Sequence, residues 1–286
     1  MAKMESRGIS TGAIVAVVVA VTVVTVVTSV GLYSILVGPG EGTTTPTTTT
    51  TNTTPPTTTT PTTTTTSPLV DTSAPTVTLE NDYYVVHYEW QYPRGWFPTT
   101  WTYDARIPKE TYEYFSNKPR VSDYSEYVDS PADDVWIENL AHLFVEEAEK
   151  KGWGEFETVS FVLAFVQSWP YTSDNVTTPY DEYPRYPVET IVDNGGDCED
   201  TSILFSSIVR GMGYGTVLLK LEEDDHMAVG VLISQNIVNN WNQSYSLTYY
   251  TSNGKIYAYC ETTGEGWELG HKPEDLKSTT ARLIPV

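Results

Sequence analysis

Hydrophobic and polar positions divide the chain into three stretches. The first, residues 9–37, holds 29 residues without a charged side chain and is rich in valine. As a helix it would span about 43 Å at about 1.5 Å per residue, whereas a bilayer core needs about 20 residues. It is too long for the apolar region of a secretory signal, and no small-residue cleavage site ends it. The pattern therefore predicts one uncleaved transmembrane helix over residues 9–37.

Charges before this helix predict its orientation. Lys3 and Arg7 precede the apolar run, and positive residues favour the cytoplasmic side. Residues 1–8 are then a cytoplasmic tail, and everything after Gly38 lies outside the cell, in a single-pass protein of the plasma membrane. The stretch "SRGIST" also resembles the processing site of archaeal pilin-like precursors, cut between Gly8 and Ile9. A filament subunit that begins at Ile9 is therefore one alternative.

The second stretch, residues 38–76, has almost no apolar side chains to bury. Of the 24 residues 43–66, 19 are threonine and 4 are proline. Such a composition cannot offset the entropy of ordering, and proline keeps it extended. Threonine-proline tracts are typical of glycosylated stalks. Acceptor sequons at Asn52, Asn175 and Asn242 fit an extracellular location. We expect this stalk to hold the rest of the chain away from the membrane.

The third stretch, residues 77–286, has the pattern of a globular domain. Aromatic and β-branched residues predict strands over 82–90 and 99–107. Helical periodicity follows over 130–153, and a more apolar helix over 155–169 ends before Pro170. The proline-rich segment 178–196 is expected to be an ordered loop. The apolar face of the first helix is Val135, Leu140, Leu143, Phe144 and Ala148.

A third helix and a run of strands complete the domain. The helix opens at Cys198 and ends at Gly211 and Gly213, and its buried stripe is Ile203, Leu204, Ile208 and Met212. Later strands are expected over 216–222, 226–234, 245–252, 255–261 and 281–286, with a tight hairpin at Asn253-Gly254. Helices first and an antiparallel sheet afterwards predict an α+β domain.

Net charge limits the partners. The formal charge is −21 at pH 7, which disfavours nucleic acid because nucleic-acid binding uses a basic face. The acidic run 222–225 is expected to be a solvated loop. Calcium on this loop would be chemically reasonable, but no calcium-loop spacing is present. We expect no cofactor and no metal.

The strongest chemical signal is "NGGDCED", residues 194–200. It carries Cys198, one of only two cysteines, at a glycine turn that opens a helix. The unpaired N–H groups and positive dipole of a helix start favour thiolate, and the backbone N–H can stabilise an oxyanion. Asp197, Glu199 and Asp200 act in the opposite direction and raise the thiol pKa. A catalytic thiol at this place therefore needs a base, preferably histidine.

Four histidines are present, and His226 fits this role best. It opens the strand 226–234, whereas His87 lies in an early strand, His142 in a helix and His271 in a surface-like loop. Glu261 at the end of strand 255–261 is placed to orient the imidazole. Strand alternation puts Glu261 and Cys260 on opposite faces, so only one of the two can point at His226.

Three blocks of sequence carry a family resemblance: "GGDCEDTSILFSSIVRGMGYG", "DDHMAVGV" and "YAYCETTGEGWELG". Together they resemble the transglutaminase-like superfamily, especially its archaeal members. The resemblance implies a papain-like α+β core and thiol acyl-transfer chemistry, as peptidase or transglutaminase. It implies Cys198 as nucleophile, His226 as base and Glu261 as the acidic member. The family's commonest acid is aspartate, often before Pro-Thr, so glutamate before Thr-Thr is a departure.

The resulting hypothesis is a cell-surface thiol enzyme that hydrolyses or transfers acyl groups of peptide or carboxamide bonds in a peptide or protein substrate. The Cys198 backbone N–H is one oxyanion donor, and Gln167 or Trp169 is the other candidate. An inactive adhesion or recognition module on the same fold is the main alternative. A structural Cys198–Cys260 disulfide and a simple helix cap stay open. Zinc on Cys198, His226 and Cys260 lacks the usual ligand spacing.

Overall fold

The computed structural model describes residues 24–28, 31–32, 76–93, 99–130, 134–174 and 183–286. Most of the expected membrane helix and all of the expected stalk up to residue 75 lie outside these residues. Two short pieces of the expected span are strands, β1 (Val24–Thr28) and β2 (Gly31–Leu32). Among the described residues, no helix combines the length and the apolar character needed to cross a membrane. The span and the stalk stay predictions.

The first sheet has the strand order β2-β1-β5-β4-β3. An antiparallel meander of β3 (Thr76–Glu80), β4 (Tyr83–Gln91) and β5 (Thr100–Pro108) forms the sheet from its edge at β3 to its middle strand β5. Burial alternates along β4 and β5, since one face of the sheet packs against helices and the other does not. The two strands expected here are confirmed; β3, which is largely exposed, was not expected.

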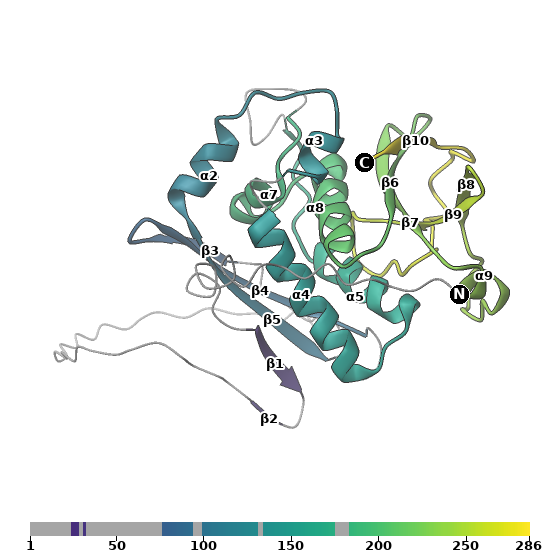
Figure 1. Cartoon of the computed structure of the whole chain (residues 1–286), viewed down its shortest axis with the longest axis horizontal. Coiled ribbons are helices and arrows are strands. Elements are labelled where there is room, and N and C mark those ends of the chain that lie inside the picture. Colours follow the sequence, from purple (N-terminus) through teal and green to yellow (C-terminus); the bar gives the residue numbers. More distant parts are fainter. Residues whose placement is uncertain (1–23, 29–30, 33–75, 94–98, 131–133, 175–182) are drawn as a thin grey trace, which may run out of the picture.

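A helical layer lies between this sheet and a second one (Figure 1). Helix α4 (Asp134–Lys151) matches the expected amphipathic helix, α5 (Glu155–Val166) the expected more apolar helix, and α8 (Cys198–Gly211) the third. Val135 is 39% exposed, so the buried face of α4 turns toward Trp136, Ile137, Leu140, Ala141, Phe144 and Ala148. The bounds are α2 (Lys109–Ser116), α3 (Ser125–Val128), α4 (Asp134–Lys151), α5 (Glu155–Val166), α7 (Pro187–Asp193) and α8 (Cys198–Gly211).

The expected loop over 178–196 is wrong in its second half, which forms α7. Pro187 stands at the start of this helix, where a missing N–H costs nothing. The Glu189 carboxylate accepts the Tyr186 N–H at 2.9 Å and completes a capping box. Asn194 ends the helix in the left-handed region, at φ 59°. The density of proline and aromatic residues hid this short helix.

The second sheet is antiparallel, with the order β10-β6-β7-β9-β8. Each of its five strands corresponds to an expected one, and Asn253-Gly254 forms the expected hairpin with both φ angles positive. The short helix α9 (Gln235–Asn239) was not expected. The strand bounds are β6 (Thr216–Leu221), β7 (His226–Leu232), β8 (Tyr249–Ser252), β9 (Lys255–Cys260) and β10 (Arg282–Pro285).

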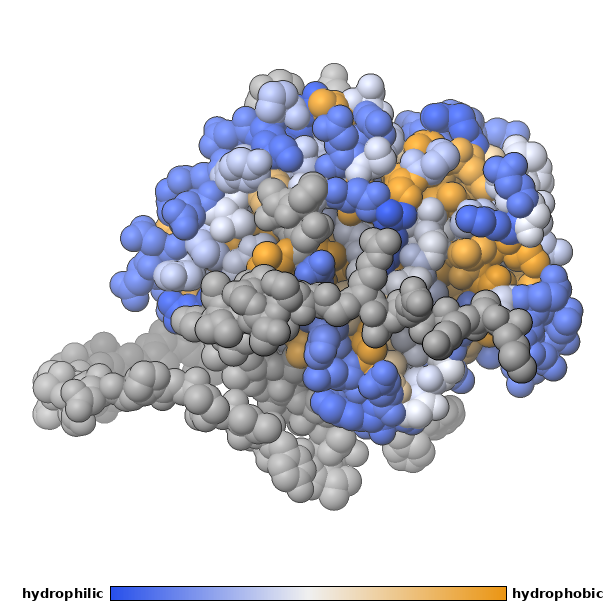
Figure 2. All heavy atoms as spheres, viewed as in Figure 1, coloured by the Kyte–Doolittle hydropathy of each residue, from blue (hydrophilic) through white to orange (hydrophobic). Residues whose placement is uncertain are grey.

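Helix α8 is the centre of the core. Ile203, Leu204, Phe205 and Ile208 have no exposed surface, and α8 packs against β6 and β7 on one side and α4, α5 and α7 on the other. Burying each such side chain contributes about 1.5–3 kcal/mol. Figure 2 shows polar residues over much of the surface of the helical layer, with apolar residues gathered around the second sheet. The described domain is therefore a mixed α+β fold, as expected.

Candidate active site

Cys198 is the first residue of α8, as expected. Asp197 caps the helix: its side chain accepts the N–H groups of Glu199 at 3.1 Å and Asp200 at 3.4 Å. Asp200 in turn accepts the Asp197 N–H at 3.3 Å. A side chain at Gly196 would lie 2.4 Å from Asp200 Cβ, so only glycine fits before this cap. The glycines therefore start the helix at the cysteine.

His226 and Glu261 form a pair in the second sheet. His226 Nε2 lies 3.0 Å and 3.2 Å from the two Glu261 carboxylate oxygens. Tyr259 donates its hydroxyl to the same carboxylate at 2.5 Å, and Thr263 donates its N–H at 2.9 Å and its hydroxyl at 2.6 Å. With Nε2–H donated to Glu261, Nδ1 is the nitrogen able to accept a proton.

The Glu261 carboxylate is held ionised. The residue is 2% exposed, and burial alone would raise its pKa. Hydrogen bonds and charge from His226, with the bonds from Thr263 and Tyr259, outweigh burial and lower the pKa. A buried carboxylate with four hydrogen bonds holds one orientation, which is what a group that orients an imidazole requires.

The start of α8 is fastened to both of these strands. The Met227 N–H, next to His226, faces the Cys198 sulfur. One turn further along the helix, Ser202 Oγ donates to Met227 O at 3.3 Å. Thr262, next to Glu261, lies 3.0 Å from Thr201 Oγ1 and 3.1 Å from Ser202 Oγ, hydroxyl to hydroxyl. The structure thus brings the three predicted residues to one place: Cys198 opens α8, His226 opens β7, and Glu261 directly follows β9.

The thiol itself is turned toward Glu199. Cys198 Sγ donates to Glu199 Oε2 at 2.9 Å, and within the described residues it has no hydrogen bond to His226. Lys220 Nζ lies 3.7 Å from the other Glu199 oxygen. Burial, and then the Glu199 carboxylate, raise the pKa of Cys198. In this arrangement burial and the acidic neighbours keep Cys198 as a thiol.

Tyr171 is a neighbour that the sequence did not reveal. It is 59% exposed, and its backbone pairs with Gly196, two residues before the cysteine. Partial burial, and then the nearby Cys198, raise the pKa of its phenol to about 12. Tyr171 therefore lies near the sulfur and is exposed at the surface.

Cys260 lies on the other face of its strand. It is fully buried in the cluster that packs against α8, whereas Glu261 points to His226. Both cysteines are free thiols. The arrangement agrees with the strand alternation and gives no support to the disulfide.

The two expected oxyanion donors differ. Gln167 is 2% exposed, and its Nε2 donates to Glu261 O and to Trp267 O, both at 2.8 Å, so neither amide hydrogen is available for a substrate. Trp169 is 5% exposed, and its Nε1 has no hydrogen-bond partner within the described structure. The backbone N–H of Cys198 likewise makes no hydrogen bond to another described residue.

Among the described residues, three carboxylates at the start of α8 form a group that could hold a cation, although the sequence had suggested no metal site. Oxygens of Asp174, Asp197 and Asp200 lie within 4.8 Å of one another. Arg185, 1% exposed, bonds Asp174 at 2.8 Å and also pairs with Asp200. Burial, and then the neighbouring carboxylates, raise the pKa of Asp197 to about 8. The guanidinium already supplies positive charge to this cluster.

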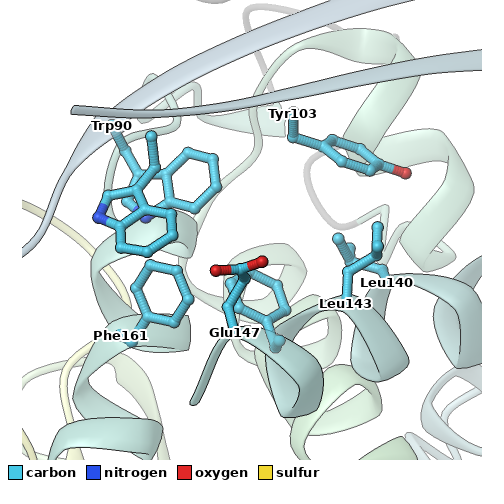
Figure 3. A pocket seen from close by; sticks show the side chains of 8 residues that line it. Trp90, Tyr103, Leu140, Leu143, Glu147 and Phe161 are labelled. Atoms are coloured by element: carbon cyan, nitrogen blue, oxygen red, sulfur yellow. The ribbon is translucent and has the colours of Figure 1, made fainter. Parts of the chain in front are cut away.

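Two cavities lie away from the cysteine. One, of about 20 Å³, lies between the first sheet and α4 and α5; Figure 3 shows Trp90 and Tyr103 on its strand side and Glu147 on its helix side. The other, of about 380 Å³, is lined by the ends of α4 and α8 and the start of α5, including Trp153, Glu155 and Tyr214. Neither is lined by a residue of the predicted triad.

Of the three sequons, the structure describes one. Asn242 is exposed after α9, and its side-chain oxygen accepts Gln243 Nε2 at 3.4 Å. Asn52 and Asn175 lie outside the described residues.

No protein-family model matches the chain, and no curated protein matches it. Similar solved structures include calcium-bound LapG of Legionella pneumophila, 16% identical, with a TM-score of 0.29 over 62% of this chain and 81% of that one. A solved structure entitled "Putative Cysteine Protease from Cytophaga hutchinsonii" is 14% identical, with a TM-score of 0.31 over 75% of this chain and 71% of that one. A structure entitled "TGase" is 14% identical, with a TM-score of 0.26 over 58% of this chain and 50% of that one. These likenesses are too remote to carry an assignment.

Proposed function

We propose that this chain is a thiol acyl-transfer enzyme with a Cys198-His226-Glu261 triad, of the transglutaminase-like kind that its sequence blocks resemble. The observation that carries the proposal is the His226–Glu261 pair fastened beside the first turn of α8, where Cys198 lies. A nucleophile, a base and an orienting carboxylate on three elements are the parts that covalent acyl transfer requires.

The first half-reaction follows from these positions. His226 Nδ1 takes the proton from Cys198 Sγ while Nε2–H stays bonded to Glu261, and the sulfur attacks the carbonyl carbon of a peptide or carboxamide. We assign the oxyanion to the Cys198 N–H, with Trp169 Nε1, which has no hydrogen-bond partner among the described residues, as the candidate second donor. When the C–N bond breaks, the imidazolium gives its proton to the departing amine, which leaves a thioester on Cys198.

The second half-reaction decides between hydrolysis and transfer. Water or an acceptor amine attacks the thioester, His226 accepts the proton of the attacking group, and the sulfur leaves with the proton returned to it. Both outcomes use the same residues, and no cofactor takes part. Before the first half-reaction, the thiol has to leave Glu199, to which it donates here, and turn toward His226.

The expected location fits substrates at the cell surface. With residues 9–37 across the plasma membrane and residues 38–76 as a stalk, the domain would reach peptides or proteins outside the cell. The charge of −21 gives no basic face for nucleic acid.

A second candidate is an inactive recognition module on the same fold. It is favoured by one observation: Cys198 donates to Glu199 and not to the imidazole, with a raised thiol pKa. In that case Cys198 would be an inert core thiol, and exposed aromatic residues such as Tyr171 would contact a ligand.

A measurement of enzymatic turnover distinguishes the thiol enzyme from the inactive recognition module. The full chain would be incubated with a mixture of unfolded proteins and a labelled primary amine, and products identified by mass spectrometry. New peptide ends indicate hydrolysis, and incorporated amine indicates transfer. Cys198→Ala should abolish both while Cys260→Ala retains them. Product that persists in Cys198→Ala would contradict the proposal.

A further inference from the structure

One short segment touches both halves of the candidate site. Residues 167–172, which follow α5, are called here the brace segment. At its far end Thr172 N–H donates to Gly196 O at 2.9 Å, and Gly196 N–H donates to Pro170 O at 3.4 Å. A side chain at Gly195 would lie 2.4 Å from Pro170 O, so the two backbones are in close contact. This end lies against the turn that carries the nucleophile.

The near end of the brace segment holds the loop that carries the acid. Gln167 Nε2 donates to Glu261 O and Trp267 O, and Gln167 Oε1 accepts the Gly266 N–H at 3.2 Å. Both amide hydrogens and the amide oxygen are therefore hydrogen-bonded. The side chain is 2% exposed. Two donors and one acceptor on a neutral group are what only Gln or Asn supplies.

We propose that Gln167 is a positioning residue: by fixing the backbone of Glu261 it keeps the carboxylate against His226 Nε2 and so keeps the imidazole in the tautomer with Nδ1 free of hydrogen. Its effect on the thiol rests on the function proposed above, whereas its effect on the tautomer does not. The reasoning is geometric, since the His226–Glu261 contact of 3.0 Å does not survive a shift of about 1 Å in the Glu261 backbone.

The direct readout is the ring of His226. The full chain, with only four histidines, would be labelled with ¹⁵N-histidine and studied by NMR well above the ordinary histidine pKa of about 6.5. In the wild type we expect one tautomer, protonated on Nε2. Gln167→Met keeps the length of the side chain but removes all of its side-chain hydrogen bonds. In this variant we expect ¹⁵N chemical shifts of the His226 ring that are averaged between the two tautomers. Gln235→Met is the matched control, because Gln235 is exposed and its side chain bonds, among the described residues, only Asn239 in its own helix.

Iodoacetamide labelling of Cys198 is the second readout. Near neutral pH we expect Gln167→Met to lower the rate about tenfold or more, toward the rate in His226→Ala. If Gln167→Met does not fold, Gln167→Glu replaces it: the carboxylate keeps the shape and accepts Gly266 N–H but donates to neither carbonyl. An unchanged His226 tautomer in the folded variant would overturn the positioning role. An altered tautomer, with labelling independent of His226 even in the wild type, would leave that role standing and refute the thiol mechanism.

Discussion

At the scale of single residues, two carboxylates have opposite effects on the reactivity of Cys198. Glu261 serves the imidazole, and Glu199 holds the thiol. One favours reaction through a fixed base, and the other opposes it by keeping the sulfur protonated. The sequence indicated this opposition through the acidic neighbours of Cys198, but it could not show which neighbour touches the sulfur, because that depends on side-chain rotamers in the folded state.

Replacing Glu199 tests its hold on the thiol. Burial and then Glu199 raise the pKa of Cys198, so Glu199→Gln should lower that pKa and increase the thiolate fraction at neutral pH. Each pKa unit is worth about tenfold in labelling rate while the thiol is mostly protonated. Rates of Cys198 labelling by iodoacetamide, measured from about pH 6 to about pH 10, would give the change in this pKa. Glu223→Gln, at an exposed carboxylate, is the control, and equal rates in the two variants would refute the role of Glu199.

The lowered pKa of Glu261 makes a pH-dependent contribution to stability. Its folded pKa lies below the unfolded value, about 4.3 for glutamate. The contribution is therefore full above that value and is lost as pH falls through the folded pKa. Unfolding free energy measured in urea should fall less steeply with acid in Glu261→Gln than in the wild type, and Gln should cost about 1–3 kcal/mol at neutral pH. Parallel pH curves would contradict this.

At the scale of elements, the site depends on where α8 begins. Asp197 and the two preceding glycines set that start, and all of them are visible in the sequence. Helix α7, which leads into this turn, was not: its capping box depends on Glu189 reaching back to Tyr186, within a segment that proline and aromatic residues made resemble a loop. The brace segment was also hidden, because the Gln167 side chain bonds residues 94 to 100 positions further along the chain.

The Asp197 cap can be tested by a pair of variants. Asp197→Ala removes the acceptor for the Glu199 and Asp200 N–H groups, whereas Asp197→Asn keeps an acceptor. The alanine variant should be less stable than the asparagine variant by about 1 kcal/mol. Urea unfolding at neutral pH measures the difference; equal stabilities would mean that the cap does not hold the start of α8.

At the scale of the whole molecule, the order of helices and strands was readable because periodicity of hydrophobic residues reports burial directly. Cys198, His226 and Glu261 were found as separate motifs, and the fold supplies their meeting point through Thr262 and Met227. The predicted oxyanion role of Gln167 could not be tested from the sequence, because the hydrogen-bond partners of a glutamine at a helix end depend on the folded structure. The membrane helix and stalk over residues 9–76 remain predictions.

The central claim is that Cys198 reacts with the help of His226. The most direct test is the rate of Cys198 labelling by iodoacetamide in the full chain, located by mass spectrometry, in the wild type and in His226→Ala at several pH values, with buried Cys260 as the internal reference. The account predicts labelling of Cys198 near neutral pH that falls at least about tenfold in His226→Ala. Equal rates in the two proteins, or no labelling of Cys198 unless the protein is unfolded, would contradict it.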